Sequence, residues 1–311
     1  MKRALVLILI LCTILSSAYA ESTAYVCNPD PSDRLHLRAE ANQDSPSLGK
    51  YYNGTEVTVL RTLGNGWAEV IVGKGSGSLQ GFMMTRFLSA KAPEDARPQF
   101  ASSLAFKTYV QPVLSTVHTR YGAGELVSLL GFTPEWHHIM IHLKGRSVTC
   151  FVPASITELT ALDAQSAVVN AYVSNPDSSD RLHLRTEPAK NSESLGKYYN
   201  GSVGKLMGFT PDGGWLKVDL YGRTGYMDRS YITIEGKTNY CMYGIPSVKP
   251  KGSAPVLYLE YPVSSASSKG VTENAEIEVL GLVNEEWLHV RADGETGYML
   301  RANTTYIDPK E

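Results

Sequence analysis

The sequence predicts an all-β protein, a tandem array of small β-barrels that follows an N-terminal signal peptide. Three observations support this prediction: a block of 31 residues occurs twice, four tryptophans recur at similar spacing, and apolar residues alternate with polar ones over short stretches. The blocks at 24–54 and 171–201 are identical at 23 of 31 positions, without a gap. Self-similarity at a fixed period is typical of arrays of repeated structural units.

Residues 1–20 have the features of a secretory signal peptide. Lys2 and Arg3 precede an apolar run at 4–11, and small residues follow at Ala18 and Ala20, as a signal peptidase requires. The run is far shorter than the roughly 20 residues that a membrane-spanning helix needs, and no later stretch is long and apolar enough. We therefore expect cleavage after Ala20 and a secreted protein, extracellular or associated with the cell wall, or periplasmic if the cell has two membranes.

The charge and cysteine content of the mature chain restrict its partners and its chemistry. The 291 residues that follow the signal peptide carry 27 basic and 31 acidic side chains, so a nucleic-acid partner, which would select a basic surplus, is not expected. Three cysteines remain, Cys27, Cys150 and Cys241, and an odd number leaves at least one unpaired. Their pairing stays open, although Ser174 stands at the position of Cys27 in the second block.

Each of the four tryptophans marks one module. Trp67, Trp136, Trp215 and Trp287 lie 69, 79 and 72 residues apart. The modules are placed at 24–90, 104–158, 169–235 and 254–308, and are called modules 1 to 4. The separators have the composition of linkers, with Pro93 and Pro98 in 91–103 and Pro246, Pro250 and Gly252 in 236–253. The stretch 155–168 has enough helical character to suggest a short connecting helix.

Within a module the pattern predicts short strands throughout. Polar and apolar residues alternate from 34 to 38, so Leu35 and Leu37 are expected to point inward. Gly49 permits a bulge that lets Leu48 and Tyr51 face the same side, so Tyr51 and its copy Tyr198 are predicted in the core. The Asn-Gly pairs at 53–54 and 200–201 predict tight turns. A small sheet of this size hides its edges by curling into a barrel.

These modules resemble the bacterial SH3 (SH3b) family. In module 1 the resemblance lies in LHLR at 35–38, LGKYYNG at 48–54, VTVL at 57–60, Trp67 and GFM at 81–83, and module 3 repeats most of these features. Module 4 fits more loosely, and module 2 fits only around 117–120 and Trp136. The resemblance implies small SH3-like β-barrels that commonly bind bacterial cell-wall peptide or other extracellular ligands.

Eight residues are candidates for ligand binding. Because Leu216 and Val218 share the core-facing side of one strand, Trp215 is expected near the barrel rim, where an aromatic ring can stack on a peptide or sugar. The alternative is that this ring packs across the rim loop and binds nothing. The second tyrosine of each Tyr-Tyr-Asn-Gly run is expected to be exposed. The full set is Trp67, Tyr52, Asp33 and Arg38 in module 1, and Trp215, Tyr199, Asp180 and Arg185 in module 3.

Structural alternatives exist for the polar candidates. The alternative for Tyr52 and Tyr199 is a solvated tyrosine in a structural hairpin. Asp33 and Asp180 follow an Asn-Pro-Asp sequence, and the alternative for them is hydrogen bonding to loop amides. For the arginines at the strand ends, Arg38 and Arg185, it is hydrogen bonding to loop carbonyls.

A group of histidines in module 2 raises the question of a catalytic or metal site. His137 occupies the place of Leu216 and is expected in the core. His138 and His142 share a face, with Cys150 nearby, but four residues on a strand span roughly 13 Å, whereas each ligand of a zinc ion lies about 2 Å from it. The chain also lacks a nucleophile elbow, phosphate loop or metal motif. We therefore expect no enzymatic activity, no cofactor and no metal.

Two binding functions remain open. In the first, an exported non-enzymatic protein binds peptidoglycan or its peptides through modules 1 and 3, with strength gained by multivalency, while modules 2 and 4 act as spacers. In the second, the chain is a scaffold or adhesin-like ectodomain that binds an extracellular protein or glycan. The sequence leaves open whether the modules pack together or swing freely.

Overall fold

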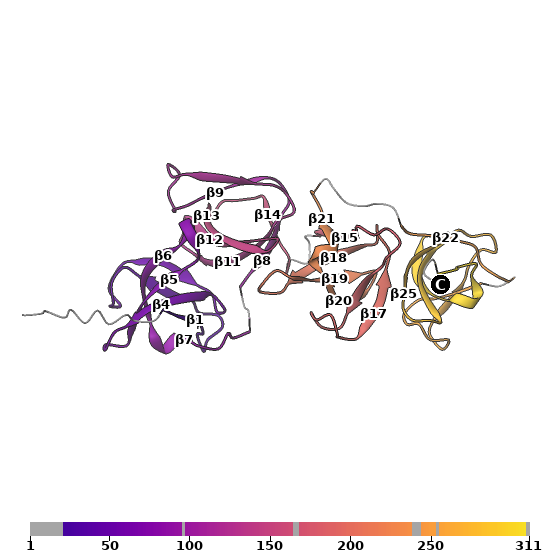
Figure 1. The fold of residues 1–311 in the computed structure, drawn as a ribbon, viewed down its shortest axis with the longest axis horizontal. Helices are drawn as coiled ribbons and strands as arrows, with labels where there is room; N and C mark the ends of the chain where they lie inside the picture. The colour runs from indigo at the N-terminus through magenta and orange to yellow at the C-terminus, as the bar shows by residue number, and fades with distance from the viewer. Residues whose placement is uncertain (1–20, 95–96, 164–167, 238–243, 253–254, 309–311) are drawn as a thin grey trace, which may run out of the picture.

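The computed structural model describes residues 21–94, 97–163, 168–237, 244–252 and 255–308. The predicted signal peptide and Cys241 lie outside these described residues. The fold is all-β, as predicted: the described part contains 27 strands, and its helical elements are four short 3₁₀ turns. No helix in these ranges is long and apolar enough to cross a membrane. Four β-rich modules follow one another along the chain, from indigo to yellow in Figure 1.

The four modules use one succession of strands. Module 1 contains β1 (Ser22–Val26), β2 (Leu35–Arg38), β3 (Ser47–Tyr51), β4 (Glu56–Thr62), β5 (Trp67–Val72), β6 (Leu79–Met84) and β7 (Leu88–Ser89), with 3₁₀ turns η1 (Gly75–Gly77) and η2 (Thr85–Phe87). Module 2 contains β8 (Gln99–Ser102), β9 (Phe106–Tyr109), β10 (His118–Tyr121), β11 (Leu126–Phe132), β12 (Trp136–Leu143), β13 (Arg146–Pro153) and β14 (Leu159–Ala161).

Module 3 repeats this succession, and module 4 repeats it without the last strand in its described residues. Module 3 contains β15 (Asn170–Val173), β16 (Leu182–Arg185), β17 (Ser194–Tyr198), β18 (Val203–Phe209), β19 (Trp215–Leu220), β20 (Arg223–Asp228), η3 (Arg229–Tyr231) and β21 (Ile232–Ile234). Module 4 contains β22 (Ser247–Val248), β23 (Val256–Tyr258), β24 (Ser268–Gly270), β25 (Ile277–Leu282), β26 (Trp287–Ala292), β27 (Glu295–Leu300) and η4 (Arg301–Asn303).

The local predictions for the core of module 1 are confirmed. Leu35 and Leu37 are buried, because alternate residues of β2 face the barrel interior. The register between β2 and β3 shifts beside Gly49, and this bulge lets Leu48 and Tyr51 join one apolar cluster. Tyr51 and Tyr198 are among the largest fully buried side chains.

The predicted separators take part in the fold, and from here on module 2 includes β8 and β14 and module 4 includes β22. β8 lies within 91–103 and pairs with β11 and β14, and β22 lies within 236–253 and pairs with β25. The connecting helix expected at 155–168 is wrong in its described part, where Leu159–Ala161 forms the strand β14. These strands have only two to four residues, and their composition resembles that of a linker.

The modules are joined in two pairs, 1 with 2 and 3 with 4. β3 pairs with β11 through Tyr51 and Gly131, and β17 pairs with β25 through Tyr198 and Gly281. As a result β1–β14 form one sheet and β15–β27 form another. A Cβ on either glycine would lie 2.6 Å from a carbonyl oxygen of the facing strand, so only glycine fits this close approach. The duplicated unit is therefore a pair of modules, and the two members of a pair do not swing freely.

A tyrosine–histidine hydrogen bond closes each pair junction. The Tyr51 hydroxyl lies 3.1 Å from His138 Nδ1, and the Tyr198 hydroxyl lies 3.0 Å from His289 Nδ1. His138 Nε2 donates to the carbonyl of Gly77 at 2.8 Å, which assigns the proton to Nε2 and leaves Nδ1 to accept from Tyr51. Burial lowers the pKa of His138 to about 4 and that of His289 to about 3, so both rings are neutral at pH 7.

The two pairs also contact each other, between modules 2 and 3. Ala101, Leu126 and Leu162 of module 2 belong to the buried cluster of module 3. The side-chain amide of Gln99 bonds the backbone of Phe209 twice: Nε2 donates to its carbonyl at 2.8 Å, and Oε1 accepts from its N–H at 2.9 Å. The amide thus acts as one more rung of a β-ladder. Each module is therefore packed against its neighbours in the chain (Figure 1).

Candidate functional site

A cavity of about 240 Å³ opens at the rim of module 3. Three of the four residues predicted in this module converge on it: Asp180 from the loop before β16, Arg185 at the end of β16, and Trp215 at the start of β19. The cavity is also lined by Asn175, Arg181, Leu182, His183, Lys190, Asp228 and Tyr231. Its walls thus combine two aromatic rings with both signs of charge.

Strand alternation places Trp215 at this rim, as predicted. Leu216 and Val218 are fully buried in the core of module 3, so Trp215 starts β19 outside the core and is half-buried. Its cross-strand partner is Asp228. The ring therefore stands beside a carboxylate and opens onto the cavity.

Asparagine side chains hold the loop that carries Asp180. Asn200 Oδ1 accepts from the backbone N–H of Asn175 at 2.6 Å, and Asn200 Nδ2 donates to its carbonyl at 2.7 Å. The side chain of Asn175 in turn donates to Asp180 Oδ2 at 3.4 Å. Asn53 clamps Asn28 in the same way in module 1. The Asn-Gly pair predicted the turn but not the hydrogen bonds of Asn200 to Asn175, because Asn175 lies 25 residues earlier in the sequence.

The basic side chains of the cavity differ in their exposure and in their hydrogen bonds. Arg185 Nη1 donates to the Ser192 carbonyl at 2.6 Å, the structural role that was the alternative for this arginine, and this bond fixes its orientation. Lys190 is exposed. His183 lies 2.7 Å from the Ser194 hydroxyl, and burial, assisted by the charge of Arg185, lowers its pKa to about 4. His183 is therefore a neutral hydrogen-bonding group near pH 7.

Tyr199 does not belong to this cavity, and the expectation that it is exposed is wrong. Its side chain is 2% exposed, and its hydroxyl bonds that of Tyr306 near the end of module 4. Arg181 joins the same network, with Nη1 donating to Asp308 Oδ2 at 2.7 Å. The reason is tertiary: the final segment of module 4 covers the tyrosine from a position 107 residues later in the sequence.

The corresponding face of module 1 is less polar. Asp33 and Arg38 are held as in module 3, with Asp33 accepting from Asn28 and Arg38 donating to Ser45. Trp67, predicted to line a groove, is only 6% exposed, and its cross-strand partner is Met84 where Trp215 has Asp228. An apolar partner packs against the indole and hides it from solvent.

Other substitutions separate the two faces further. In the duplicated block Gln43 stands at the position of Lys190. Tyr52 is half-buried beside Phe132, and the Arg34 guanidinium lies 4.1 Å from the centre of its ring. Module 1 therefore offers fewer charges and less aromatic surface at this rim than module 3.

The histidines of module 2 have structural surroundings. His138 belongs to the junction with Tyr51, and His142 lies 2.8 Å from the Ser128 hydroxyl and edge-on to Phe209 of module 3. His137, expected in the core, is half-buried, while Ile139 and Ile141 further along its face are fully buried.

Cys150 lies in the core of module 2, and burial raises the pKa of its thiol to about 12. Cys27 and Cys150 are free thiols. Within the described ranges, no three His, Cys, Asp or Glu side chains are placed to hold a metal.

Comparison with known proteins agrees with the sequence resemblance. The family model of the bacterial SH3 domain matches residues 33–89 and 180–233, within modules 1 and 3. No curated protein sequence matches the chain. Among solved structures, NlpC2 from Trichomonas vaginalis has 12% identity and a TM-score of 0.23, covering 46% of this chain and 50% of its own. A Listeria monocytogenes protein provisionally described as an autolysin has 16% identity and a TM-score of 0.17, covering 68% and 95%. The chain spans about half the length of the NlpC2 structure.

Proposed function

We propose that this chain, whose modules 1 and 3 are bacterial SH3 domains, is an exported non-enzymatic protein that binds peptidoglycan, with the module 3 cavity as its principal site for wall peptide. One observation supports this proposal above the others: Asp180, Arg185 and Trp215, chosen from sequence as ligand candidates, converge on one cavity. The secreted location belongs to the same proposal, because it rests on the sequence of residues 1–20.

The chemistry of the cavity suits a short peptide attached to sugar. Arg185 and Lys190 can hold a carboxylate, while Asp180 and Asp228 can accept from amine or amide N–H groups, and charge-assisted bonds of this kind are the stronger ones. Trp215 offers a ring face for stacking, and Tyr231 adds an exposed aromatic edge. A few polar groups around an aromatic wall are the usual composition of a small-ligand site.

Modules 1 and 3 are proposed to contribute unequally. Module 1 keeps Asp33 and Arg38 but has Met84 and Gln43 where module 3 has Asp228 and Lys190, so fewer charged groups face a ligand. We assign it a weaker contact that adds to the avidity of the chain. Module 2 holds modules 1 and 3 in a fixed arrangement, through its junction with module 1 and its contacts with module 3.

The proposal predicts that Trp215→Ala abolishes sedimentation with insoluble peptidoglycan at protein concentrations where the wild type pellets. Loss of an aromatic anchor typically weakens binding by about 2 kcal/mol, or roughly thirtyfold. Trp136→Ala is the matched control, because Trp136 is also half-buried and begins the corresponding strand of module 2. Both variants are checked for folding by circular dichroism.

Two results would contradict the proposal. If the wild type stays in the supernatant with sacculi of several wall types, an extracellular protein or glycan becomes the leading partner. If purified protein releases soluble fragments from the sacculi, the non-enzymatic assignment fails.

A further inference from the structure

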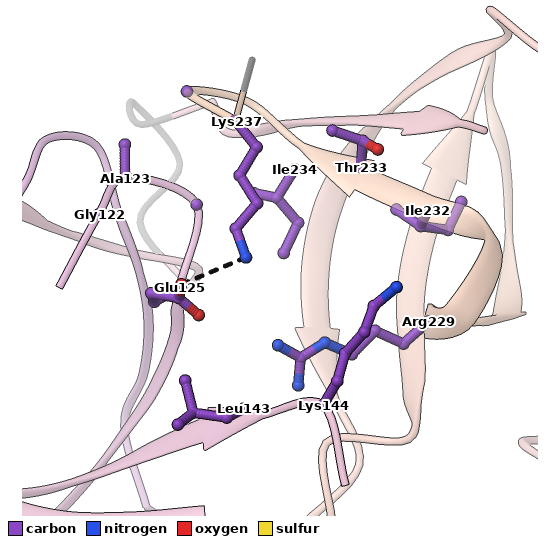
Figure 2. A pocket seen from close by; sticks show the side chains of 12 residues that line it. Gly122, Ala123, Glu125, Leu143, Lys144, Arg229, Ile232, Thr233, Ile234 and Lys237 are labelled. Carbon is purple, nitrogen blue, oxygen red and sulfur yellow. Dashed lines mark ion pairs between the residues drawn. The ribbon is translucent and has the colours of Figure 1, made fainter. Parts of the chain in front are cut away.

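A second and larger cavity, of about 560 Å³, lies where modules 2 and 3 meet (Figure 2). Module 2 contributes the turn at 122–125 and the hairpin residues Leu143 and Lys144. Module 3 contributes Arg229 of η3 together with β21 and the residues that follow it. Neighbouring residues of η3 and β20, Tyr231 and Asp228, line the first cavity instead, so one 3₁₀ turn separates the two sites.

This cavity contains a buried cation, Arg229, whose side chain makes one long hydrogen bond within the described residues. Arg229 is 8% exposed, and Figure 2 shows its guanidinium pointing into the space between the modules. Its Nη1 lies 3.4 Å from the Gly213 carbonyl, which is long for a hydrogen bond. Within the described part of the chain, Arg229 forms no ion pair. Burial lowers the pKa of Arg229, and nearby Glu125 opposes this shift.

A buried acceptor faces the same space. Glu125 Oε1 lies 3.3 Å from Lys237 Nζ, whereas Glu125 Oε2 is buried and has no hydrogen-bond partner among the described residues. An unmade hydrogen bond at a buried polar group is costly; the Glu125 oxygen lacks one, while the Arg229 side chain has only its long hydrogen bond to Gly213. Three basic side chains line the cavity against one carboxylate, with Lys144 adding to Arg229 and Lys237.

We infer that this cavity binds a short peptide with a free carboxylate, held between modules 2 and 3. The carboxylate accepts from the Arg229 guanidinium and the Lys144 ammonium, and an N–H of the same ligand donates to Glu125 Oε2. The surplus of basic side chains favours an anionic group, and the unpaired oxygen of Glu125 favours a ligand that also carries an N–H donor. The volume is within the range of small-ligand sites. This site is independent of the proposed wall-peptide cavity.

The test titrates the mature protein with three probes, alanyl-alanine, its C-terminal amide and inorganic phosphate, followed by calorimetry. The dipeptide is expected to bind, and the amide, which lacks the carboxylate, to bind at least about tenfold more weakly. Phosphate lacks the amide N–H, so it is also expected to bind more weakly. Arg229→Met is expected to weaken dipeptide binding at least about tenfold.

Lys144→Gln keeps the inference testable if the Arg229 variant does not fold, because Lys144 is exposed. It is expected to weaken dipeptide binding severalfold, whereas Lys217→Gln, at an exposed lysine on β19, leaves it unchanged. The inference is overturned if the dipeptide shows no saturable binding up to about 10 mM, or if the amide binds as tightly as the acid. Phosphate binding as tight as that of the dipeptide overturns the assignment to a peptide. An unchanged affinity in Lys144→Gln overturns the location.

Discussion

Lowering the pH from 7 to 5 is expected to remove roughly 4 kcal/mol of the free energy of unfolding through His138 and His289 together. Both rings are buried and neutral at pH 7, with a pKa of about 4 for His138 and about 3 for His289, against about 6.5 in an unfolded chain. Below pH 6.5 the unfolded state therefore binds more protons than the folded state. The contribution of these two histidines to the free energy of unfolding is fully present above pH 6.5. It falls as the pH decreases, by about 1.4 kcal/mol per pH unit for each histidine.

Thermal unfolding at pH 7, 6 and 5 measures this effect. The double variant His138→Gln and His289→Gln keeps a donor and an acceptor at each position but cannot titrate, so its melting temperature is expected to depend less on pH. His118→Gln is the control, because His118 is exposed and its replacement is expected to leave the pH dependence unchanged. A double variant with the pH dependence of the wild type would show that the junction histidines do not control acid stability.

Replacing Tyr198 with alanine is expected to cost about 3–5 kcal/mol, the range for loss of a large buried aromatic side chain. The ring fills the core of module 3, and its hydroxyl closes the junction through His289. Tyr198→Phe keeps the ring but leaves His289 Nδ1 unpaired, which costs about 1–3 kcal/mol. These two variants therefore separate the packing contribution from the hydrogen bond.

Urea unfolding and limited proteolysis test this expectation. Tyr261→Ala is the control, because Tyr261 is 64% exposed and surface substitutions usually change stability by less than about 0.5 kcal/mol. Tyr198→Ala is expected to expose modules 3 and 4 to protease together, because they share the junction. Cleavage of module 3 with module 4 fully protected would contradict the paired organisation.

The barrel core could be predicted from sequence because its determinants are local. Burial of alternate residues at Leu35 and Leu37, or Leu216 and Val218, follows from the two-residue period of a strand. The pairing of modules could not be predicted in this way. It depends on Gly131 meeting Tyr51 and on Tyr51 meeting His138, contacts between residues at least 80 positions apart.

The candidate site also contains some residues that could be predicted from the sequence and others that could not. Trp215 was identified because its neighbours in the strand are core residues, and Asp180 and Arg185 because their loop is duplicated. Asp228 was missed, since only the folded barrel brings the end of β20 beside the start of β19. Lys190, in the loop between β16 and β17, was missed as well. A comparison of modules 1 and 3 could have identified both residues. Lys190 and Asp228 are charged, whereas module 1 has the uncharged Gln43 and Met84 at the corresponding positions. Trp67 was misjudged because its apolar neighbour Met84 lies across the sheet.

The most direct test of the wall-binding proposal is an NMR titration of isotope-labelled mature protein with soluble peptidoglycan fragments. Saturable shifts are expected at the amides of 175–185, Lys190, Trp215 and 228–231, with smaller shifts at the corresponding face of module 1. Trp215→Ala is expected to remove the shifts in module 3. Shifts confined to modules 2 and 4, or no shift from fragments of several wall types, would contradict the assignment of the module 3 cavity as a peptidoglycan site.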